Sequence, residues 1–312
     1  MENLIFSFNV ILPLVIEIFI GFLLKIKGII DTRTSKAMNK VVFKVLLPVM
    51  LFNNLYTSEI ADVFNPELIL FAELSILALV ILLCIIVPVF EKDNKKRGVI
   101  IQGIFRSNFV IFGLPLSMAI SGEAISGTVS VLVACVVATF NFLAVIVLEI
   151  FSHGKPDIKA IAKGVVTNPL IIASVVGFGV LMTQLKLPEA IESTLKSVSA
   201  ASTPIGLIIL GSSIDLGVIK SNVKQIAWAV AGKLIIVPAI FLTLAALMGF
   251  KNGYLAILIA VFASPTSVSS YTMADQVNQD GELAAQIVML DTCLCAVTVF
   301  MFIFVFKQLG MI

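Results

Sequence analysis

The chain has 312 residues, of which 59% are hydrophobic and 13% are charged, and its formal net charge is +2. Soluble globular domains carry about 45–50% apolar and about 25% charged residues, so this composition excludes an ordinary water-soluble fold. The small net charge and the lack of a basic face also argue against nucleic-acid binding. We therefore expect an all-α integral membrane protein.

Apolar blocks of about 20 residues recur along the chain, which is the length that a helix needs to cross a hydrocarbon layer of roughly 30 Å. Charged residues, glycines or prolines bound each block. The blocks lie at approximately 4–24, 38–57, 67–90, 98–120, 126–150, 158–182, 192–214, 225–248, 253–274 and 283–306. This pattern predicts ten transmembrane helices.

Basic residues concentrate in the odd-numbered connections between these blocks. Lys25 and Arg33 lie in the first connection, Lys95 and Arg97 in the third, and Lys224 in the seventh. Cytoplasmic loops of membrane proteins carry an excess of Lys and Arg. We therefore predict a multi-pass protein of the plasma membrane with the odd loops in the cytoplasm and both termini outside it.

Prolines recur in the second half of the chain at nearly constant spacing, which indicates an internal repeat. Two pairs are 156 residues apart and two are 150 apart, namely Pro13 with Pro169, Pro48 with Pro204, Pro88 with Pro238, and Pro115 with Pro265. Each half holds five blocks, an odd number, so the second half enters the membrane from the opposite side. We predict two inverted repeats, 1–151 and 152–312, an architecture typical of alternating-access transporters.

The fourth and ninth blocks each carry a proline near their middle, Pro115 and Pro265. A proline inside a helix removes a backbone hydrogen bond, and in lipid the freed groups must find partners in protein, water or ligand. Broken helices at matching positions of two halves predict a transport site, with half-helix amino termini suited to an anion. The polar residues that we expect beside these breaks are Asn108, Ser264, Thr266, Ser267 and Ser269. The alternative is that both prolines only kink helices whose hydroxyls bond back to their own backbone.

Five charged residues fall inside the apolar blocks, where an unpaired ion costs several kcal/mol. They are Glu17, Glu73, Arg106, Lys233 and Asp291. Arg106 is a candidate to attract or bind an anion, and Glu73 and Asp291 are candidates for a coupling proton. For these two carboxyls, an internal ion pair that fixes packing stays an equal alternative.

Catalytic and metal-binding chemistry has little support in the sequence. The single histidine, His153, lies in a polar connection, and all four cysteines lie in apolar blocks. An intramembrane hydrolase needs histidine, acidic or serine groups arranged at membrane depth, and a passive channel has no need of two inverted halves. We therefore expect neither an enzyme nor a cofactor or metal site.

Four motifs resemble the auxin efflux carrier family, which includes plant PIN auxin exporters and bacterial malate and malonate permeases. Residues 106–116 open with Arg-Ser-Asn-Phe and close with Gly-Leu-Pro-Leu, and residues 263–271 read Ala-Ser-Pro-Thr-Ser-Val-Ser-Ser-Tyr. Asn-Pro-Leu stands at 168–170, and Thr-Pro begins the segment 203–211 that ends in glycine. The resemblance covers essentially the whole chain.

The resemblance implies the crossover-helix fold shared with bile-acid and sodium/proton transporters. Blocks one, two, six and seven would then form a scaffold, and blocks three to five and eight to ten would carry the crossover in an elevator motion. It implies that Asn108, Pro115 and Pro265 shape a pocket for a carboxylate such as malate, malonate or an auxin-like acid, which Asn53 faces from the scaffold. A sodium-coupled organic anion symporter of the bile-acid type is the runner-up. Substrate identity, direction, coupling ion and oligomeric state, a homodimer included, stay open.

Overall fold

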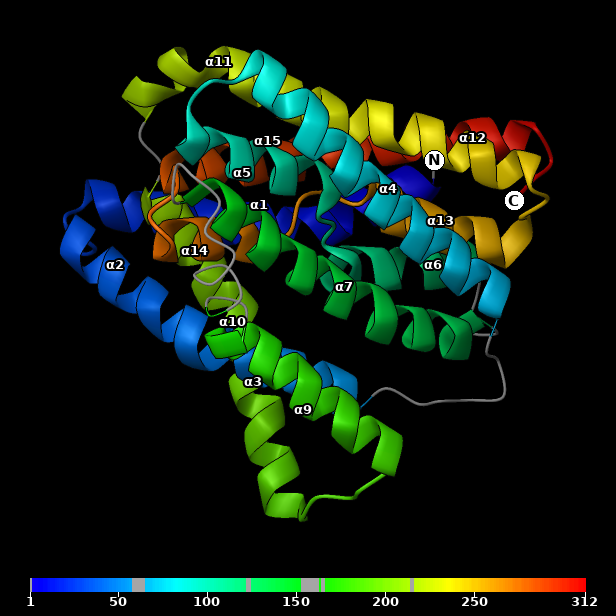
Figure 1. Ribbon diagram of the computed structural model, residues 1–312, viewed down its shortest axis with the longest axis horizontal. Helices are drawn as coiled ribbons and strands as arrows, with labels where there is room; N and C mark the ends of the chain where they lie inside the picture. The colour runs from blue at the N-terminus through cyan, green and yellow to red at the C-terminus, as the bar shows by residue number, and fades with distance from the viewer. Residues whose placement is uncertain (1, 58–64, 122–124, 153–162, 164–165, 214–215) are drawn as a thin grey trace.

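The computed structural model describes residues 2–57, 65–121, 125–152, 163, 166–213 and 216–312, and Figure 1 shows these residues as helices joined by short connections. Among them there is no strand, only one isolated β-bridge between Ser107 and Thr266. The elements are α1 (Glu2–Ile26), α2 (Thr32–Val41), η1 (Val42–Leu46), α3 (Leu47–Tyr56), α4 (Pro66–Phe90), α5 (Asn94–Phe105), η2 (Phe109–Gly113), α6 (Leu114–Ser121), α7 (Ser126–Ser152), α9 (Pro169–Thr183), α10 (Glu189–Ser213), α11 (Leu216–Ala231), η4 (Gly232–Ile236), α12 (Val237–Leu247), α13 (Asn252–Ala263), α14 (Ser269–Gln276) and α15 (Gly281–Gln308).

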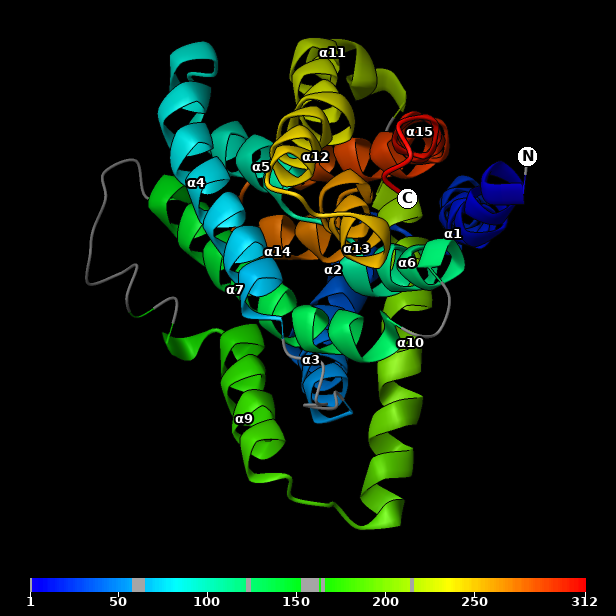
Figure 2. The same cartoon turned by 90° about the vertical axis from the view of Figure 1, so that its right-hand side faces the viewer.

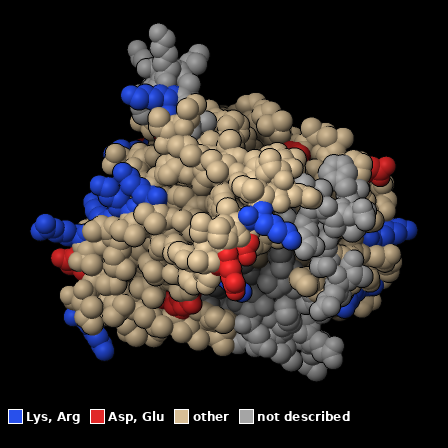
Figure 3. Space-filling model, turned by 90° about the horizontal axis from the view of Figure 1, so that it is seen from below, with Lys and Arg blue, Asp and Glu red and all other residues tan. Residues whose placement is uncertain are grey.

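The helices occupy the predicted apolar blocks, and the expectation of an all-helical membrane protein is confirmed. Five described helical segments are long and apolar enough to cross a membrane, and α9 and α13 are shorter apolar helices. Large hydrophobic side chains are exposed along them, such as Val89 at 71% and Leu247 at 79%. Charged side chains are sparse on the face shown in Figure 3. The sixth block differs from its predicted bounds, because α9 begins at Pro169 and most of residues 158–165 lie outside the described chain.

Asparagine and aspartate side chains set where several of these helices begin. The side chain of Asn65 accepts from the Leu68 N–H ahead of α4, and that of Asn168 accepts from the Leu170 N–H ahead of α9. A proline follows each asparagine at the first helical position, where the missing N–H has no intrahelical partner to lose. Asp280 caps α15 in the same way. Short polar sequences therefore fix these helix starts without tertiary help.

Three π-helical turns each end two residues before a proline. η1, η2 and η4 precede Pro48, Pro115 and Pro238, and in each case the α-helix resumes one residue before the proline. A proline has no N–H for the regular i→i−4 bond, and the wider π turn accommodates the missing bond without ending the helix. These prolines therefore bend helical chain but do not interrupt it.

Reciprocal glycines hold α1 and α10 in close contact. A Cβ on Gly21 would lie 1.9 Å from the carbonyl oxygen of Ile208, and a Cβ on Gly211 would lie 1.9 Å from that of Ile18. Only glycine lets the two backbones approach this closely, as small residues do in membrane helix pairs. The α1–α10 contact is therefore fixed by its sequence.

The remaining helices pack in two connected groups. α3 packs against α9 and α10, and Figure 2 shows α9 and α10 projecting below the rest of the molecule with α3 between them. α4 to α7 and α11 to α15 pack mainly among themselves, while α1 contacts both α10 and α15. α1 begins and α15 ends at the same end of the long helices in Figure 1.

Candidate binding site

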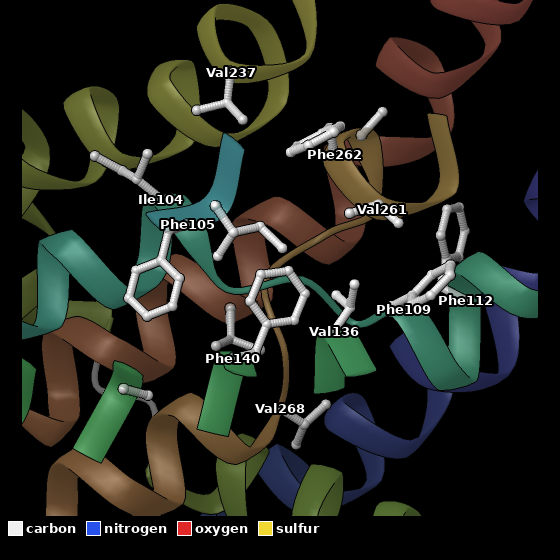
Figure 4. Close-up of a cluster of buried hydrophobic side chains, with 14 of the residues drawn as sticks. Ile104, Phe105, Phe109, Phe112, Val136, Phe140, Val237, Val261, Phe262 and Val268 are labelled. Atoms are coloured by element: carbon white, nitrogen blue, oxygen red, sulfur yellow. The ribbon is translucent and has the colours of Figure 1, made fainter. Parts of the chain in front are cut away.

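Two interrupted helices meet in the interior of the protein. The chain leaves helical geometry between α5 and η2, at residues 106–108, and again between α13 and α14, at residues 264–268. The two interruptions pair through the β-bridge, and the Asn108 N–H donates to the Pro265 carbonyl oxygen at 2.8 Å. Figure 4 shows the two extended linkers crossing among buried aromatic side chains.

The two interruptions have different local causes. Ser264 is extended, with φ −63° and ψ 151°, because the ring of Pro265 disfavours a helical residue before it. Pro115 has no such role, since it is the second residue of α6 and the first break lies seven positions earlier. The prediction that Pro115 breaks the fourth block was therefore wrong. The break at 106–108 is held by its pairing with the other linker, which the sequence does not reveal.

Ser264 and Thr266 bind other parts of the protein, not the site that we expected them to line. The Ser264 hydroxyl donates to the Ala260 carbonyl oxygen at 2.5 Å, and both residues are fully buried. The Thr266 hydroxyl lies 2.5 Å from the Gly103 carbonyl oxygen at the end of α5 and also contacts the carboxyl of Asp291. The Thr266 hydroxyl therefore links the two interruptions to α15, whereas the Ser264 hydroxyl bonds back to its own helix, as the alternative interpretation expected.

A cavity lies between the crossing and the α3–α10 pair. Its volume is about 50 Å³. One water needs about 10–15 Å³ of such a cavity, so a few waters fit. The crossing contributes Arg106, Ser107, Asn108, Ser267, Ser269 and Thr272, the neighbouring α7 contributes Asn141, and the opposite wall contributes Met50, Asn54, Ser202 and Thr203. Among the described residues, no acidic side chain lines this cavity. Of the predicted site residues, the structure thus brings Arg106, Asn108, Ser267 and Ser269 together.

Asn54, and not the predicted Asn53, faces this cavity. The carbonyl oxygen of Asn53 accepts from the backbone N–H and the hydroxyl of Thr57, and its side chain is not among the lining groups. A π-helical turn holds one residue more than an α-helical turn, so η1 rotates the faces of α3 relative to a regular helix. Sequence reasoning treated this block as one regular helix, and it therefore missed the rotation that the π turn ahead of Pro48 introduces.

Arg106 places a buried positive charge at the cavity. The residue is 3% exposed, and its guanidinium donates to the Asn141 side-chain oxygen and to the sulfur of Met273, which are both neutral. Among the described residues, no carboxylate acts on it. A guanidinium stays charged in a protein interior, and a charge without a counter-ion is costly there. The cavity therefore contains a buried positive charge that a bound anion would neutralise.

The helix ends at the cavity have the same polarity. η2 begins at Phe109 and α14 begins at Ser269, and both residues line the cavity. The first N–H groups of a helix lack intrahelical partners and carry a partial positive charge. Both resumed helices thus begin at the cavity wall, where their partly positive ends favour an anion, although the N–H groups of Ser270 and Tyr271 in α14 already donate to Ser267 and Val268.

The other charged candidates lie elsewhere. Asp291 is fully buried on α15 and touches Thr266 behind the linker, outside the set of groups that line the cavity. Glu73 on α4 interacts with Thr139 of α7 and does not line the cavity either. The three charged residues that we grouped together therefore belong to three different places.

The known proteins that this chain resembles are named as transporters. A family described as "Membrane transport protein" matches residues 6–167 and 158–303. An uncharacterized transporter of Methanocaldococcus jannaschii is 22% identical, over 91% of this chain and 94% of that protein. One from Methanothermobacter thermautotrophicus is 20% identical, over 94% and 96%. A Rhizobium meliloti protein named "Putative malonate transporter" is 21% identical, over 93% of each chain.

Proposed function

Because the chain belongs to the membrane transport protein family, which includes the auxin efflux carriers, we propose that it is a carrier for a small organic anion whose carboxylate binds at Arg106. The family and the named relatives are transporters and not enzymes. The chain is a multi-pass membrane protein, and a small-molecule substrate in a lipid bilayer follows from the family. The anionic character of that substrate is the part that the site itself supports.

The uncompensated charge of Arg106 is the observation that carries the proposal. A planar guanidinium binds a carboxylate through two parallel hydrogen bonds, and such charge-assisted bonds are roughly twice as strong as neutral ones. Asn108, Ser267 and Ser269 line the same cavity and provide neutral donors and acceptors around it. A neutral or cationic solute would leave the buried guanidinium without a counter-ion.

A small carboxylate is the substrate class that we propose, with malonate first, then malate and auxin-like acids. The relative from Rhizobium meliloti is the reason to place malonate first, because its name contains that acid. The small cavity also favours a compact acid in this conformation.

We propose that transport proceeds by alternating access between two inverted halves. The lengths of matching elements support a repeat, because α5 and α13 have 12 residues each, and α7 and α15 have 27 and 28. The cavity lies between the crossing and the α3–α10 pair, as an elevator that moves the crossover helices past a scaffold of α1, α3, α9 and α10 requires. In this topology there are ten transmembrane helices, and both termini lie on the outer side of the plasma membrane.

Counterflow in proteoliposomes tests this function. Vesicles that contain the protein are loaded with one unlabelled acid from a panel of malonate, malate, acetate and indole-3-acetate, and uptake of the same labelled acid is followed. A carrier exchanges labelled for unlabelled acid, because its site can return loaded with the internal acid. Absence of exchange for every acid in the panel would contradict an organic-anion carrier, and uptake that is independent of the internal acid would indicate a pore.

A further inference from the structure

One hydroxyl group joins the two interrupted helices to a buried carboxyl. Oγ1 of Thr266 lies 2.5 Å from the carbonyl oxygen of Gly103 and also within hydrogen-bond distance of Oδ2 of Asp291. Thr266 and Asp291 are both fully buried, so water does not compete for these contacts. These three oxygen atoms therefore connect α5 to α15 through the second linker, residues 264–268.

The Gly103 carbonyl needs a donor at this place. It lies near the end of α5, and its regular i→i−4 donor would be the N–H of Ser107, which lies in the extended linker outside the helix. A buried carbonyl without a donor is costly. The Thr266 hydroxyl lies within hydrogen-bond distance of this carbonyl and is the donor to it.

Counting protons then assigns one to Asp291. These three oxygen atoms make two contacts within hydrogen-bond distance, and each contact needs a hydrogen. The threonine hydroxyl has one hydrogen and the carbonyl has none. If Thr266 donates to Gly103, the hydrogen between Thr266 and Asp291 must come from the carboxyl, which is then a neutral acid.

Complete burial of Asp291 favours the neutral acid, against a backbone hydrogen bond from Thr266 and the charge of Lys233, which both favour the carboxylate. Its second oxygen, Oδ1, is buried and has no hydrogen-bond partner among the described residues, as a neutral acid tolerates better than a carboxylate does. Lys233 of η4 is also buried and is the one charged side chain of the described elements around α15 that acts on Asp291. On α15 itself, Cys295 is the titratable neighbour.

We propose that Asp291 is the proton-binding residue of this carrier, and that its proton determines whether Thr266 links the two interrupted helices. With the proton bound, Asp291 donates to Thr266, which donates to Gly103. When Asp291 releases this proton during the transport cycle, the carboxylate accepts the hydrogen bond of the Thr266 hydroxyl, and the Gly103 carbonyl loses its donor. The link between α5 and the second linker then opens. Asn108 lies beside this link, because its N–H donates to Pro265, the residue before Thr266.

The coupling of this proton to substrate movement rests on the proposed function, whereas the protonated state of Asp291 does not. Infrared spectroscopy of the purified full-length protein in lipid nanodiscs at neutral pH measures that state directly. We expect a carbonyl band of a buried carboxylic acid that disappears in Asp291→Asn. In Thr266→Val the band persists but shifts to higher frequency, because the acid has lost its acceptor. Ser264→Ala is the matched control, since it removes a buried hydroxyl of the same linker that contacts only Ala260, and we expect no shift.

Two results would overturn the proton site: the same bands in the wild type and in Asp291→Asn, or a band that Thr266→Val leaves in place. The first result would make Asp291 a carboxylate that pairs with Lys233, and the second would mean that the acid of Asp291 does not donate to Thr266. In proteoliposomes, an inward proton gradient should accelerate malonate uptake by the wild type, and this acceleration should be lost in Asp291→Asn. Counterflow without the band would refute this inference and leave the carrier function standing. The band without counterflow for any acid would refute the carrier function and leave the protonated state of Asp291 standing.

Discussion

The two interruptions that cross at the centre of this protein differ in what completes them. In the second, the hydroxyls of Ser264 and Thr266 bond to Ala260, Gly103 and Asp291, so the protein itself satisfies the linker. In the first, Arg106 has neutral protein partners only and borders the cavity. Under the proposed function this difference is a division of tasks, in which one linker holds the crossing together and the other binds the substrate.

Removal of the charge at Arg106 is the strongest test of that division. In Arg106→Gln we expect uptake to fall by about 10- to 100-fold, the range that corresponds to losing hydrogen bonds to a charged group at about 1.5–3 kcal/mol. The melting temperature should not fall, because an uncompensated buried charge has also been removed. Counterflow and thermal unfolding of the same preparation measure both effects.

Arg106→Lys is the matched variant, because it keeps the charge and loses the planar fork. We expect an intermediate uptake. Equal uptake by the wild type and Arg106→Gln would place the substrate elsewhere, and a large loss of thermal stability would make Arg106 a structural residue like those of the second linker.

Thr266→Val should produce the opposite profile, with a clear loss of stability. The variant keeps the shape of the side chain but leaves the Gly103 carbonyl buried without a donor, at a cost of about 1–3 kcal/mol. Thermal unfolding against Ser267→Ala, which removes a hydroxyl at the cavity, measures the contrast. A fall in stability of the same size in both variants would remove the distinction between holding and lining residues.

Pro265→Ala should lower uptake more than Pro238→Ala. Pro265 keeps Ser264 extended and ends α13, whereas Pro238 is the second residue of α12 behind a π turn. An alanine lets the linker sample helical conformations, which at about 0.4–1 kcal/mol corresponds to a two- to fivefold effect. Initial uptake rates of the two variants at equal protein density measure this difference. Equal rates would show that the break does not depend on Pro265.

The smallest effect concerns the wall opposite the crossing. Asn54→Ala should raise the KM for uptake by about two- to tenfold, the effect of one neutral hydrogen bond of about 0.5–1.5 kcal/mol. Asn53→Ala should leave KM unchanged, since its side chain does not line the cavity. A larger effect in Asn53→Ala would mean that the wall presents a different face of α3 to the substrate.

The sequence by itself determined the features that depend on local chemistry. Apolar block length predicted the positions of the helices, because a hydrocarbon layer requires about 20 apolar residues from each spanning helix. Asn65 and Asn168 followed by proline mark helix starts, and Pro265 marks the end of α13. The family motifs were likewise legible from neighbouring residues, and the family match confirms them.

The tertiary structure decided everything that depends on contacts between distant residues. The break at 106–108 exists because the other linker pairs with it, and no residue between 106 and 108 is a proline. The choice of Asn54 over Asn53 follows from a π turn that changes the helical phase. The roles of Thr266 and Asp291 depend on an oxygen of Gly103 that lies 163 positions from Thr266 along the chain. Sequence patterns record which groups are polar, but only the folded chain determines which polar groups satisfy each other and which are left for a ligand.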